Sequence, residues 1–391
     1  MAEVDVLVDL TPLDTSSRHT GTGRYVRELG RALAGLSSSE RAGLEIAGLV
    51  ALRGAAAVGP LAYEGGRALL DADGEVAWLN QRRRWLPGTL RALQPRLFHA
   101  TYHQGTPRGS FVPRVVTCLD LVRLVLHPDY LPGRWAYRRI LQTTEALRFH
   151  SASRVQAISQ HTADDLMRLC GVPASKIDIV HLGVDLERYR PVRTDAEEMA
   201  AEAIRTRYGL TRGQYFFYVG AADPRKNVDI LVRAFAKAKL PDVTLALIGK
   251  MRPADERTIG DALRDAGEPP NVRQLGFVPE EHLPSVMAGA LAFPFCSTYE
   301  GFGNVPVEAM AAGCPVLTTG LTSMKETVGD AALIVPARDV DATAAALRRL
   351  ANEPSLRHDL TVAGLSRATR FSWKNTALAS VASYAQALHS V

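Results

Sequence analysis

Short apolar runs alternate along the chain with longer segments whose apolar residues recur every three or four positions. In Gly23–Leu36, for example, Val26, Leu29 and Leu33 would form one face of a helix. The first half predicts strands at Val4–Leu10, Leu44–Val50, Arg96–Ala100, Val115–Leu119, Arg154–Ile158 and Ile177–His181, and further helices at Pro132–Phe149 and Thr162–Cys170. Because strands that alternate with helices typically form a parallel sheet, this half predicts a doubly wound α/β domain.

The same alternation starts again after a break at Leu182–Asp185 and Pro191. Thr194–Tyr208, which is rich in Ala, Glu and Arg, predicts a helical connector, and Phe371–Leu388 predicts a final helix. The strands predicted in this half are Tyr215–Val219, Leu245–Ile248, Leu291–Phe295, Pro315–Thr318 and Ala332–Val335. A chain of 391 residues exceeds one ordinary core, so we expect two α/β domains of similar size.

The composition, with 47% hydrophobic and 22% charged residues, is that of a folded globular protein. No apolar run approaches the roughly 20 residues of a membrane span, and the N-terminus lacks a basic segment followed by an apolar one. The four cysteines have no spacing typical of a metal site. We therefore expect a cytoplasmic protein with reduced, buried thiols.

The formal net charge of +5 favours anionic partners, such as nucleoside diphosphates, lipid phosphates or an acidic membrane. Basic and aromatic residues gather in Arg82–Trp85 and in Arg134–Phe149, which suggests a peripheral contact with the inner face of an anionic membrane. A solvated surface explains the Arg82–Arg84 run equally well. No zinc finger, aromatic RNA-binding motif or Lys-rich tail supports binding of nucleic acid.

The most informative motif is the glycine-containing loop that follows the predicted strand Leu291–Phe295 and opens a helix. The N–H groups and the positive end of the helix dipole attract anions there, and Gly301 and Gly303 allow close approach of the backbone. Glu300 lies before this helix and Glu308 inside it, so both carboxylates can accept hydrogen bonds from the hydroxyls of a sugar or a ribose. The alternative is that both are helix-start charges favoured by the dipole.

A second motif, Val219–Asn227, also runs from a strand into a helix. Arg225 and Lys226 would lie at the helix N-terminus, where the dipole disfavours cations unless an anion lies between them. A diphosphate would supply that anion. The alternative is that both side chains flank the turn and are solvated.

Two weaker motifs bear on whether the protein binds NAD or a metal ion. Thr20–Tyr25 places Gly21 and Gly23 at a helix start, but a dinucleotide fingerprint needs a third glycine where the chain has Val26. We therefore expect no NAD site, while a contact with a phosphate or an acceptor stays open. Asp71–Gly74 has the D-x-D spacing of metal-dependent transferases, but its polar, Gly-flanked setting is typical of a surface turn, so we expect no obligatory metal.

Together these segments resemble the family 4 retaining glycosyltransferases, and the resemblance covers nearly the whole chain. The stretch Glu300–Glu308 matches the E-x7-E signature of the family, which is the most specific of the likenesses. Further likenesses occur at Thr20–Tyr25, Val180–Tyr189, Gly220–Asn227, Gly276–Pro279, Lys325–Pro336 and Phe371–Trp373. In the family these correspond to a glycine loop, the end of the first lobe, a phosphate turn, a nucleobase loop, the continuation of the signature and the start of a final helix.

The resemblance implies the GT-B fold, in which two Rossmann-like, doubly wound α/β lobes face a deep cleft. It implies an acceptor-binding lobe at residues 1–190 and a nucleotide-sugar-binding lobe at residues 191–370. Residues 371–391 would form a helix that crosses back onto the first lobe.

The family also implies roles for individual residues. Glu300 would hold the hydroxyls of the donor sugar, Glu308 would bind the ribose, and Arg225 with Lys226 would neutralise the departing diphosphate. The remaining donor contacts would come from Gly21, Gly23, Gly220, Val278, Gly301, Phe302, Gly303, Asn304 and Val305. The anomeric configuration would be retained without a protein nucleophile. The nucleotide sugar is a substrate in this scheme, so no cofactor is implied.

Two positions depart from the family pattern. Ala221 stands where the family commonly has arginine, and Arg225 would compensate for it. Leu119 stands before Asp120 where the family often has His-Asp. Asp120 is therefore a catalytic candidate, and Arg24 and His103 are candidates for the acceptor side. The alternative for His103 is an ordinary loop histidine.

Pro224–Asn227 resembles a subset of the family that includes many mannosyltransferases. The favoured hypothesis is therefore transfer of a hexose from GDP-mannose to a glycan or a lipid-linked saccharide, and a UDP-sugar donor is the close rival. A nucleotide-sugar epimerase on the same fold would turn over without an acceptor. A non-catalytic sugar-nucleotide-binding subunit, suggested by Leu119 and Ala221, would bind without turnover.

Overall fold

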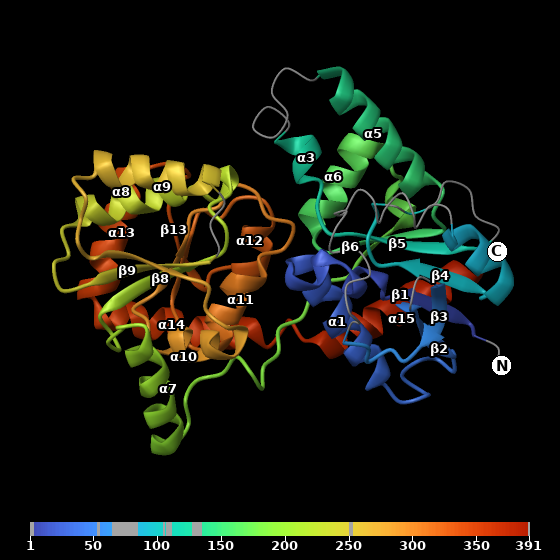
Figure 1. Ribbon diagram of the computed structural model, residues 1–391, viewed down its shortest axis with the longest axis horizontal. Coiled ribbons are helices and arrows are strands. Elements are labelled where there is room, and N and C mark those ends of the chain that lie inside the picture. Colours follow the sequence, from blue (N-terminus) through green and yellow to red (C-terminus); the bar gives the residue numbers. More distant parts are fainter. Residues whose placement is uncertain are drawn as a thin grey trace. The chain divides into compact units, whose positions relative to one another are not determined.

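The computed structural model describes residues 4–52, 55–64, 85–104, 106, 112–126, 135–249 and 253–389. The chain divides into two compact units, one formed by Met1–Gly183 with Trp373–Val391 and the other by Val184–Ser372 (Figure 1). We call them unit 1 and unit 2. The run Arg82–Arg84 and the D-x-D segment Asp71–Gly74 lie outside the described residues.

Within the described residues, the sheet of unit 1 has seven strands in the order β3-β2-β1-β4-β5-β6-β7. They are β1 (Val6–Asp9), β2 (Ile46–Leu52), β3 (Ala55–Gly59), β4 (Leu97–Ala100), β5 (Arg114–Cys118), β6 (Arg154–Ala157) and β7 (Ile177–Ile179). Neighbouring strands are parallel except β2 and β3, which are antiparallel. Strand β3 was not predicted, because its Ala- and Gly-rich segment carries no pattern typical of a strand.

The helices of unit 1 are α1 (Gly21–Ala34), α3 (Val122–Val125), α5 (Trp135–His150), α6 (Gln160–Cys170) and the C-terminal α15 (Trp373–His389), and residues 85–93 are also helical. Short 3-10 turns occur at η1 (Thr11–Asp14), η2 (Ser16–His19) and η3 (Ala174–Lys176). Phe98 and Val116 belong to an apolar core with residues of α5 and α6, including Phe149 and Leu166. Helices α1 and α15 cover the opposite face of the sheet (Figure 1).

Alternate residues of β4 and β5 tie α15 to the sheet through a buried polar network. The Nδ1 atom of His99 lies 2.7 Å from the Tyr384 hydroxyl, and its Nε2 atom lies 2.8 Å from Thr117 Oγ1. The Tyr25 hydroxyl of α1 is 2.9 Å from the same Thr117 oxygen. Burial lowers the pKa of His99 to about 3, so the imidazole is neutral near pH 7. The final helix is thus held by hydrogen bonds as well as by apolar packing.

Unit 2 contains two three-stranded parallel sheets, with the orders β10-β9-β8 and β11-β12-β13, among its described residues. Their strands are β8 (Tyr215–Val219), β9 (Thr244–Ile248), β10 (Val272–Gly276), β11 (Phe293–Phe295), β12 (Val316–Thr318) and β13 (Ala332–Ile334). A bridge between Phe216 and Ala292 joins the two sheets. Because all these strands run in parallel, the loops at their carboxyl ends gather along one edge, where open α/β sheets bind ligands.

The helices of unit 2 are α7 (Asp195–Arg207), α8 (Val228–Ala238), α9 (Pro253–Asp265), α10 (Leu283–Ala288), α11 (Asn304–Ala311), α12 (Ser323–Val328), α13 (Val340–Asn352) and α14 (Pro354–Ala368), with 3-10 turns η4 (Pro224–Lys226) and η5 (Glu280–His282). At the border of the unit, the Val184 N–H donates to the Phe371 carbonyl at 3.1 Å. The two segments that enter and leave unit 2 therefore lie side by side. The break after Gly183 precedes the expected boundary at residue 190.

Candidate active site

The loops that follow β8 and β11 are joined through the carbonyl oxygen of Arg225. That oxygen accepts hydrogen bonds from the Thr298 N–H at 2.8 Å, from Thr298 Oγ1 at 3.0 Å and from Asn227 Nδ2 at 3.3 Å. Asn227 Nδ2 also donates to the Cys296 carbonyl at 2.9 Å. Asn227 has φ of +48°, a conformation that asparagine tolerates better than most residues. The two loops therefore form one connected structure at the carboxyl edge of the sheets.

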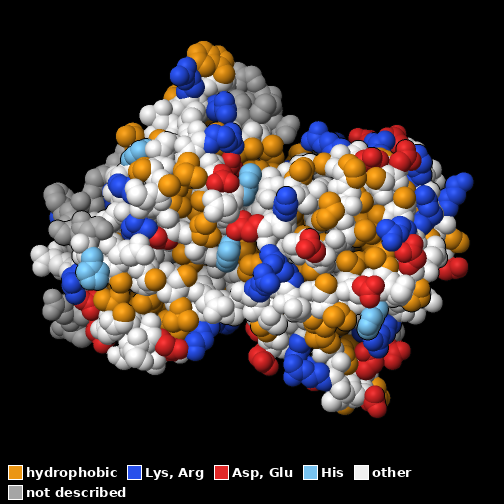
Figure 2. Space-filling model, turned by 180° about the vertical axis from the view of Figure 1, so that it is seen from behind, with side chains coloured by type: hydrophobic (Ala, Val, Ile, Leu, Met, Phe, Trp, Pro, Cys, Tyr) orange, Lys and Arg blue, Asp and Glu red, His pale blue; other side chains and the backbone are white. Residues whose placement is uncertain are grey.

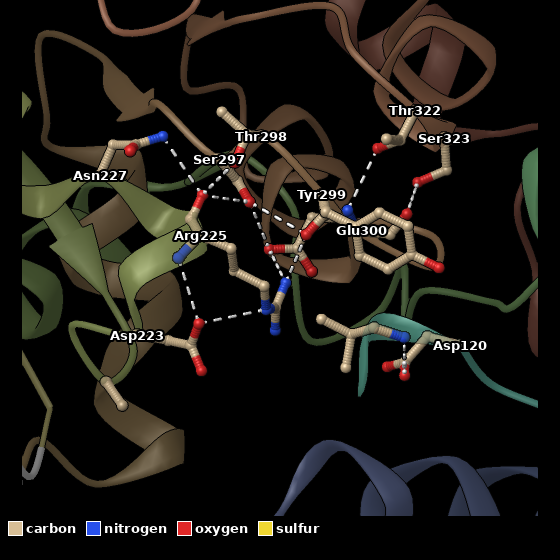
Figure 3. Close-up of polar contacts among 12 residues, drawn as sticks. Asp120, Asp223, Arg225, Asn227, Ser297, Thr298, Tyr299, Glu300, Thr322 and Ser323 are labelled. Carbon is tan, nitrogen blue, oxygen red and sulfur yellow. Dashed lines mark hydrogen bonds and ion pairs between the residues drawn. The ribbon is translucent and has the colours of Figure 1, made fainter. Parts of the chain in front are cut away.

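Glu300 is held by Arg225 and Ser297 (Figure 3). Its Oε1 atom lies 2.6 Å from Arg225 Nη1 and accepts from Ser297 Oγ at 2.9 Å. The same guanidinium nitrogen donates to the Tyr299 carbonyl at 2.6 Å, and both charged side chains are mostly buried. Arg225 and Glu300 were both predicted as site residues, but as separate contacts to a diphosphate and to a sugar. The structure adds that Arg225 orients the Glu300 carboxylate.

Hydroxyl side chains from the neighbouring loop and helix fix the backbone of Glu300. Thr322 Oγ1 accepts from the Glu300 N–H at 3.1 Å, and Ser323 Oγ donates to the Glu300 carbonyl at 2.8 Å (Figure 3). Thr322 has φ of +54°, which is strained for a β-branched residue. Such strain persists where the surroundings over-determine a conformation, often at a functional site. The sequence analysis missed Ser297, Thr322 and Ser323, because each is an ordinary loop residue until the tertiary fold places it.

Helix α11 begins immediately after Gly303, which has φ of +99° and no side-chain cap. A Cβ atom at this position would lie 1.9 Å from Met324 Cε, so any larger residue would require the Met324 side chain or the loop to shift. The N–H groups of Asn304 and Val305, in the first turn, have no partner within the helix. Asn304 Oδ1 is buried and has no hydrogen-bond partner in the part of the chain that the structure describes. Helix α11 therefore begins where the sequence predicts one, and the anion-binding role of its N-terminus stays a prediction.

Lys226 provides a second cationic group beside the Arg225–Glu300 pair. Its Nζ atom lies 5.8 Å from the centroid of the Phe295 ring and closely approaches Gly220, where a Cβ atom would be 2.8 Å away. Burial lowers the pKa of the Lys226 ammonium, and the Glu300 carboxylate opposes this shift. Among the described residues, no hydrogen bond or ion pair to this ammonium occurs. It is therefore available to an anionic ligand.

The position of Arg225 and Lys226 relative to the helix differs from the prediction. Both residues lie in the short turn η4, and α8 begins only at Val228, after the left-handed Asn227. The expected placement at the N-terminus of the long helix is therefore wrong. The reason is Pro224, which starts a separate turn that the apolar periodicity does not reveal.

The remaining donor-side candidates have contrasting settings. Glu308 is buried inside α11, with 2% of its surface exposed. Phe302 is buried and packs edge-on against Phe371, with 5.3 Å between ring centroids. Val278 has a buried side chain, whereas Phe277, next to it at the end of β10, is 75% exposed. Gly301 lies in the loop between Glu300 and Phe302 and is itself buried.

The two glycines of the segment Thr20–Tyr25 have different surroundings. A Cβ atom on Gly23 would lie 2.4 Å from backbone atoms of Ser17 and Arg18, whereas nothing lies within 4 Å of a Cβ atom on Gly21. Close packing of α1 against η2 thus accounts for Gly23, and Gly21 lies exposed at the start of α1.

A cavity of about 170 Å³ lies beside two of the other unit 1 candidates. Asp120 and His103 line it, and Asp120 Oδ1 accepts from the Val122 N–H at 3.2 Å. His103 is 6% exposed, and burial lowers the pKa of its imidazole. Arg24 is partly exposed in the first turns of α1 and does not line this cavity.

The cysteines are all unpaired and buried. Burial raises the pKa of the Cys170 and Cys296 thiols to about 12. Among residues with described positions, no cluster of three or more His, Cys, Asp or Glu side chains has an arrangement suited to a metal ion. Within the same part of the chain, no helix combines the length and apolar character needed to cross a membrane.

Comparison with known sequences gives two family matches. The family described as "Glycosyl transferases group 1" matches residues 201–367, and "Glycosyltransferase Family 4" matches residues 19–188. The O-antigen chain mannosyltransferase B of Escherichia coli is 30% identical over 275 residues, which span 69% of this chain and 70% of that protein.

Solved structures show the same fold. Sucrose-phosphate synthase from Thermosynechococcus elongatus superposes with a TM-score of 0.76 at 21% identity, over the whole of both chains. Anabaena HepE in complex with UDP-glucose superposes with a TM-score of 0.70 at 19% identity, over 99% of each chain. The predicted GT-B fold is therefore confirmed. Since its two halves match the two family descriptions and a relative of 30% identity spans most of its length, the chain belongs to the family 4 glycosyltransferases.

Proposed function

We propose that this glycosyltransferase moves mannose from GDP-mannose to a glycan or lipid-linked saccharide, with retention of anomeric configuration and without an obligatory metal ion. The observation that carries the proposal is the grouping at the carboxyl edge of the unit 2 sheets. A carboxylate fixed by Arg225, an available Lys226 ammonium and the N-terminus of α11 follow neighbouring strands. Such a grouping suits a ligand that carries both sugar hydroxyls and a diphosphate.

In this proposal, the chain acts by binding and by electrostatics. The second oxygen of Glu300 accepts hydrogen bonds from hydroxyls of the donor sugar, while Arg225 keeps the carboxylate oriented. Lys226 and the N–H groups that open α11 stabilise the negative charge that develops on the departing diphosphate. Because Arg225 and Ser297 engage Glu300, it serves as a hydrogen-bond acceptor rather than as a nucleophile. Retention then follows from attack of the acceptor on the face that the diphosphate leaves, and that phosphate accepts the acceptor proton.

Two similar proteins favour different donors. The relative from Escherichia coli is named a mannosyltransferase, which favours GDP-mannose. The similar structure of HepE contains UDP-glucose, which favours a UDP-sugar. We give precedence to the mannosyltransferase, because its sequence is the more similar of the two.

A thermal-shift panel with GDP, UDP, ADP and NAD tests the donor assignment, since a ligand that binds only the folded state raises the melting temperature. We expect the largest rise with GDP. In Lys226→Ala the affinity for GDP should fall on the order of 10–100-fold, the effect of removing one charged hydrogen-bond partner. Lys237→Ala removes the same charge from the exposed far end of α8 and should leave the affinity unchanged.

Each other outcome of this panel points to a different conclusion. A selective response to UDP would keep the transferase and replace its donor, and a response only to NAD would contradict the assignment. Turnover of GDP-mannose without any acceptor would favour the epimerase. Nucleotide binding without transfer to any acceptor would favour the non-catalytic subunit suggested by Ala221 and Leu119.

We also propose that α5 contacts an anionic membrane surface. Trp135, Ile140 and Leu147 are 71%, 63% and 51% exposed, and the exposed Arg139 lies on the same side of the helix. Figure 2 shows hydrophobic and basic side chains together at the top of the view, where α5 begins. An exposed apolar face with neighbouring cations is typical of helices that lie in the headgroup region.

Sedimentation with vesicles that contain phosphatidylglycerol, at low salt, tests this contact. We expect the wild type to sediment and Ile140→Glu to bind several-fold more weakly, because the substitution places a like charge against anionic lipid. Val362→Glu, at an equally exposed position on α14 of unit 2, is the matched control and should bind like the wild type. Equal binding by both variants would exclude α5 as the contact.

A further inference from the structure

Side-chain hydroxyls of residues 319–327, which follow β12 and run into α12, hold the backbone of the loop that contains Glu300. They belong to Thr319, Thr322, Ser323 and Thr327. The first and the last of them donate to the carbonyl groups of Ser297 and Phe302, each at 2.6 Å. The middle two bond to the N–H and to the carbonyl of Glu300 (Figure 3). The position of Glu300 therefore depends on the conformation of the segment that follows β12.

Thr322 has a backbone conformation that glycine adopts far more readily, with φ of +54° and ψ of −131°. The Met324 N–H donates to the Leu321 carbonyl at 3.0 Å and closes a turn in which Thr322 is the first central residue. These angles are typical of a type II′ turn, where glycine usually takes that position. In a β-branched residue the same angles are strained. A threonine at this position therefore needs a reason that lies in its side chain.

The hydroxyl group of Thr322 makes a contact that glycine cannot make. Its Oγ1 atom accepts a hydrogen bond from the Glu300 N–H at 3.1 Å. Arg225 binds the carboxylate of the same glutamate from another side, with 2.6 Å between Nη1 and Oε1 (Figure 3). Glycine at position 322 would relieve the strain but would leave the Glu300 N–H without this acceptor. The strain at Thr322 is thus coupled to the position of Glu300.

We infer that Thr322 is a positioning residue for the transfer reaction, and that its strained backbone is retained because its hydroxyl holds Glu300 in the orientation that turnover requires. The inference rests on the proposed function, because it concerns the reaction in which Glu300 contacts the donor sugar. If the role of Thr322 were only structural, a substitution that relieves the strain would leave turnover unchanged. A positioning role predicts that such a substitution stabilises the fold and slows the reaction.

The substitutions Thr322→Gly and Thr322→Ala separate the strain from the hydroxyl, because both remove the hydroxyl and only the first relieves the strain. The assay is release of GDP from GDP-mannose, or of UDP from UDP-glucose where the wild type prefers it, with the methyl α-glycosides of mannose, glucose and galactose as acceptors. We expect kcat to fall on the order of 10–100-fold in both variants, as for a small displacement of a group that acts on the reacting sugar. KM for the donor and the affinity for the nucleoside diphosphate should change little. The melting temperature of Thr322→Gly should exceed that of Thr322→Ala by about 2–4 °C.

Two further variants serve as controls. Thr322→Ser keeps the hydroxyl and should keep a kcat close to that of the wild type. Glu268→Gly relieves a positive φ of +50° at an exposed position after α9, and it should leave kcat unchanged. A loss of kcat in Thr322→Ser as large as that in Thr322→Ala would overturn the role of the hydroxyl.

A double-mutant cycle tests whether Thr322 acts through Glu300. In the Glu300→Ala background, Thr322→Ala should not lower the residual rate further, because the carboxylate that it positions is already absent. An equal loss in both backgrounds would mean that Thr322 acts on the reaction by another route, and the inference would be wrong.

The wild type separates the two proposals. Failure of the wild type to release a nucleoside diphosphate from any nucleotide sugar contradicts the proposed function, and the role of Thr322 with it. An active wild type whose kcat is matched by Thr322→Gly contradicts this inference alone. If Thr322→Ala does not fold, the comparison of Thr322→Gly with Thr322→Ser still decides, since these two differ in the hydroxyl.

Discussion

The carboxylates of Glu300 in unit 2 and Glu145 in unit 1 are both mostly buried, but they differ in the residues that hold them. In unit 2, Glu300 is tied by Arg225 and Ser297 through its side chain, and by Thr322 and Ser323 through its backbone. In unit 1, Arg148 donates to one oxygen of Glu145, and the other oxygen is buried and accepts no hydrogen bond from any described residue. Glu300 is thus held by residues of several different loops, whereas Glu145 is held by a residue of its own helix.

The contacts to Glu300 prearrange its carboxylate before a ligand binds. A prearranged group stabilises charge at no reorganisation cost, which suits the reacting end of the donor. The comparison therefore predicts that substitutions in the Glu300 network of unit 2 affect turnover.

Glu300→Ala is the substitution for which we expect the largest effect. We expect the rate of transfer to fall on the order of 10³-fold, because the proposed contact acts on the reacting sugar. Binding of GDP should change little, since the carboxylate does not contact the nucleotide in the proposed arrangement. The measurements are initial rates of transfer and calorimetric titration with GDP.

Glu256→Ala, on the exposed surface of α9, is the matched control for Glu300→Ala and should keep the wild-type rate. Transfer that stays within a few-fold of the wild type in Glu300→Ala would remove Glu300 from the site. A large loss of GDP affinity would instead place its carboxylate, or the Arg225 that it holds, against the nucleotide.

Much of the fold could be predicted from the sequence, since most parallel strands in the interior of the sheets lie in short, mainly apolar runs. The misses are the edge strands β3 and β10. Val272–Gly276 carries polar residues, and its arginine and glutamine are exposed in the structure, so the segment lacks the pattern of a buried strand. Edge strands need fewer apolar residues, and their pairing depends on a neighbour that the local sequence does not specify.

The candidate site shows the same limit. The local motifs predicted Glu300, Arg225 and Lys226 individually, because glycine turns after strands have a recognisable composition. The pairing of Arg225 with Glu300 could not be predicted, since it depends on the adjacency of β8 and β11 in space. The burial of Glu145 could not be predicted either, because a single glutamate in a polar helix has the pattern of a solvated charge, and only the tertiary packing of α5 buries it.

A smaller effect tests whether packing holds the unit 2 loop in place. In Gly303→Ala the new methyl group would lie 1.9 Å from Met324 Cε, at a residue whose φ is +99°. Gly267→Ala is the matched control, because Gly267 has φ of +78° but nothing within 4 Å of its Cβ position. Both should lose about 1–2 kcal/mol of the free energy of unfolding from backbone strain. Gly303→Ala should lose about 1–3 kcal/mol more from overpacking, as measured by urea denaturation.

Met324→Ala in the Gly303→Ala background isolates the clash, because it removes the side chain that the methyl group would meet. If the clash is the cause, the second substitution should cost less in this background than it does in the wild type. Equal losses in Gly303→Ala and Gly267→Ala would mean that the loop before α11 moves away from α12 with little resistance. The Glu300 backbone, which depends on Thr322 and Ser323 at the start of α12, would then be less rigid than its hydrogen bonds imply. In that case the contrast between Glu300 and Glu145 would be one of degree.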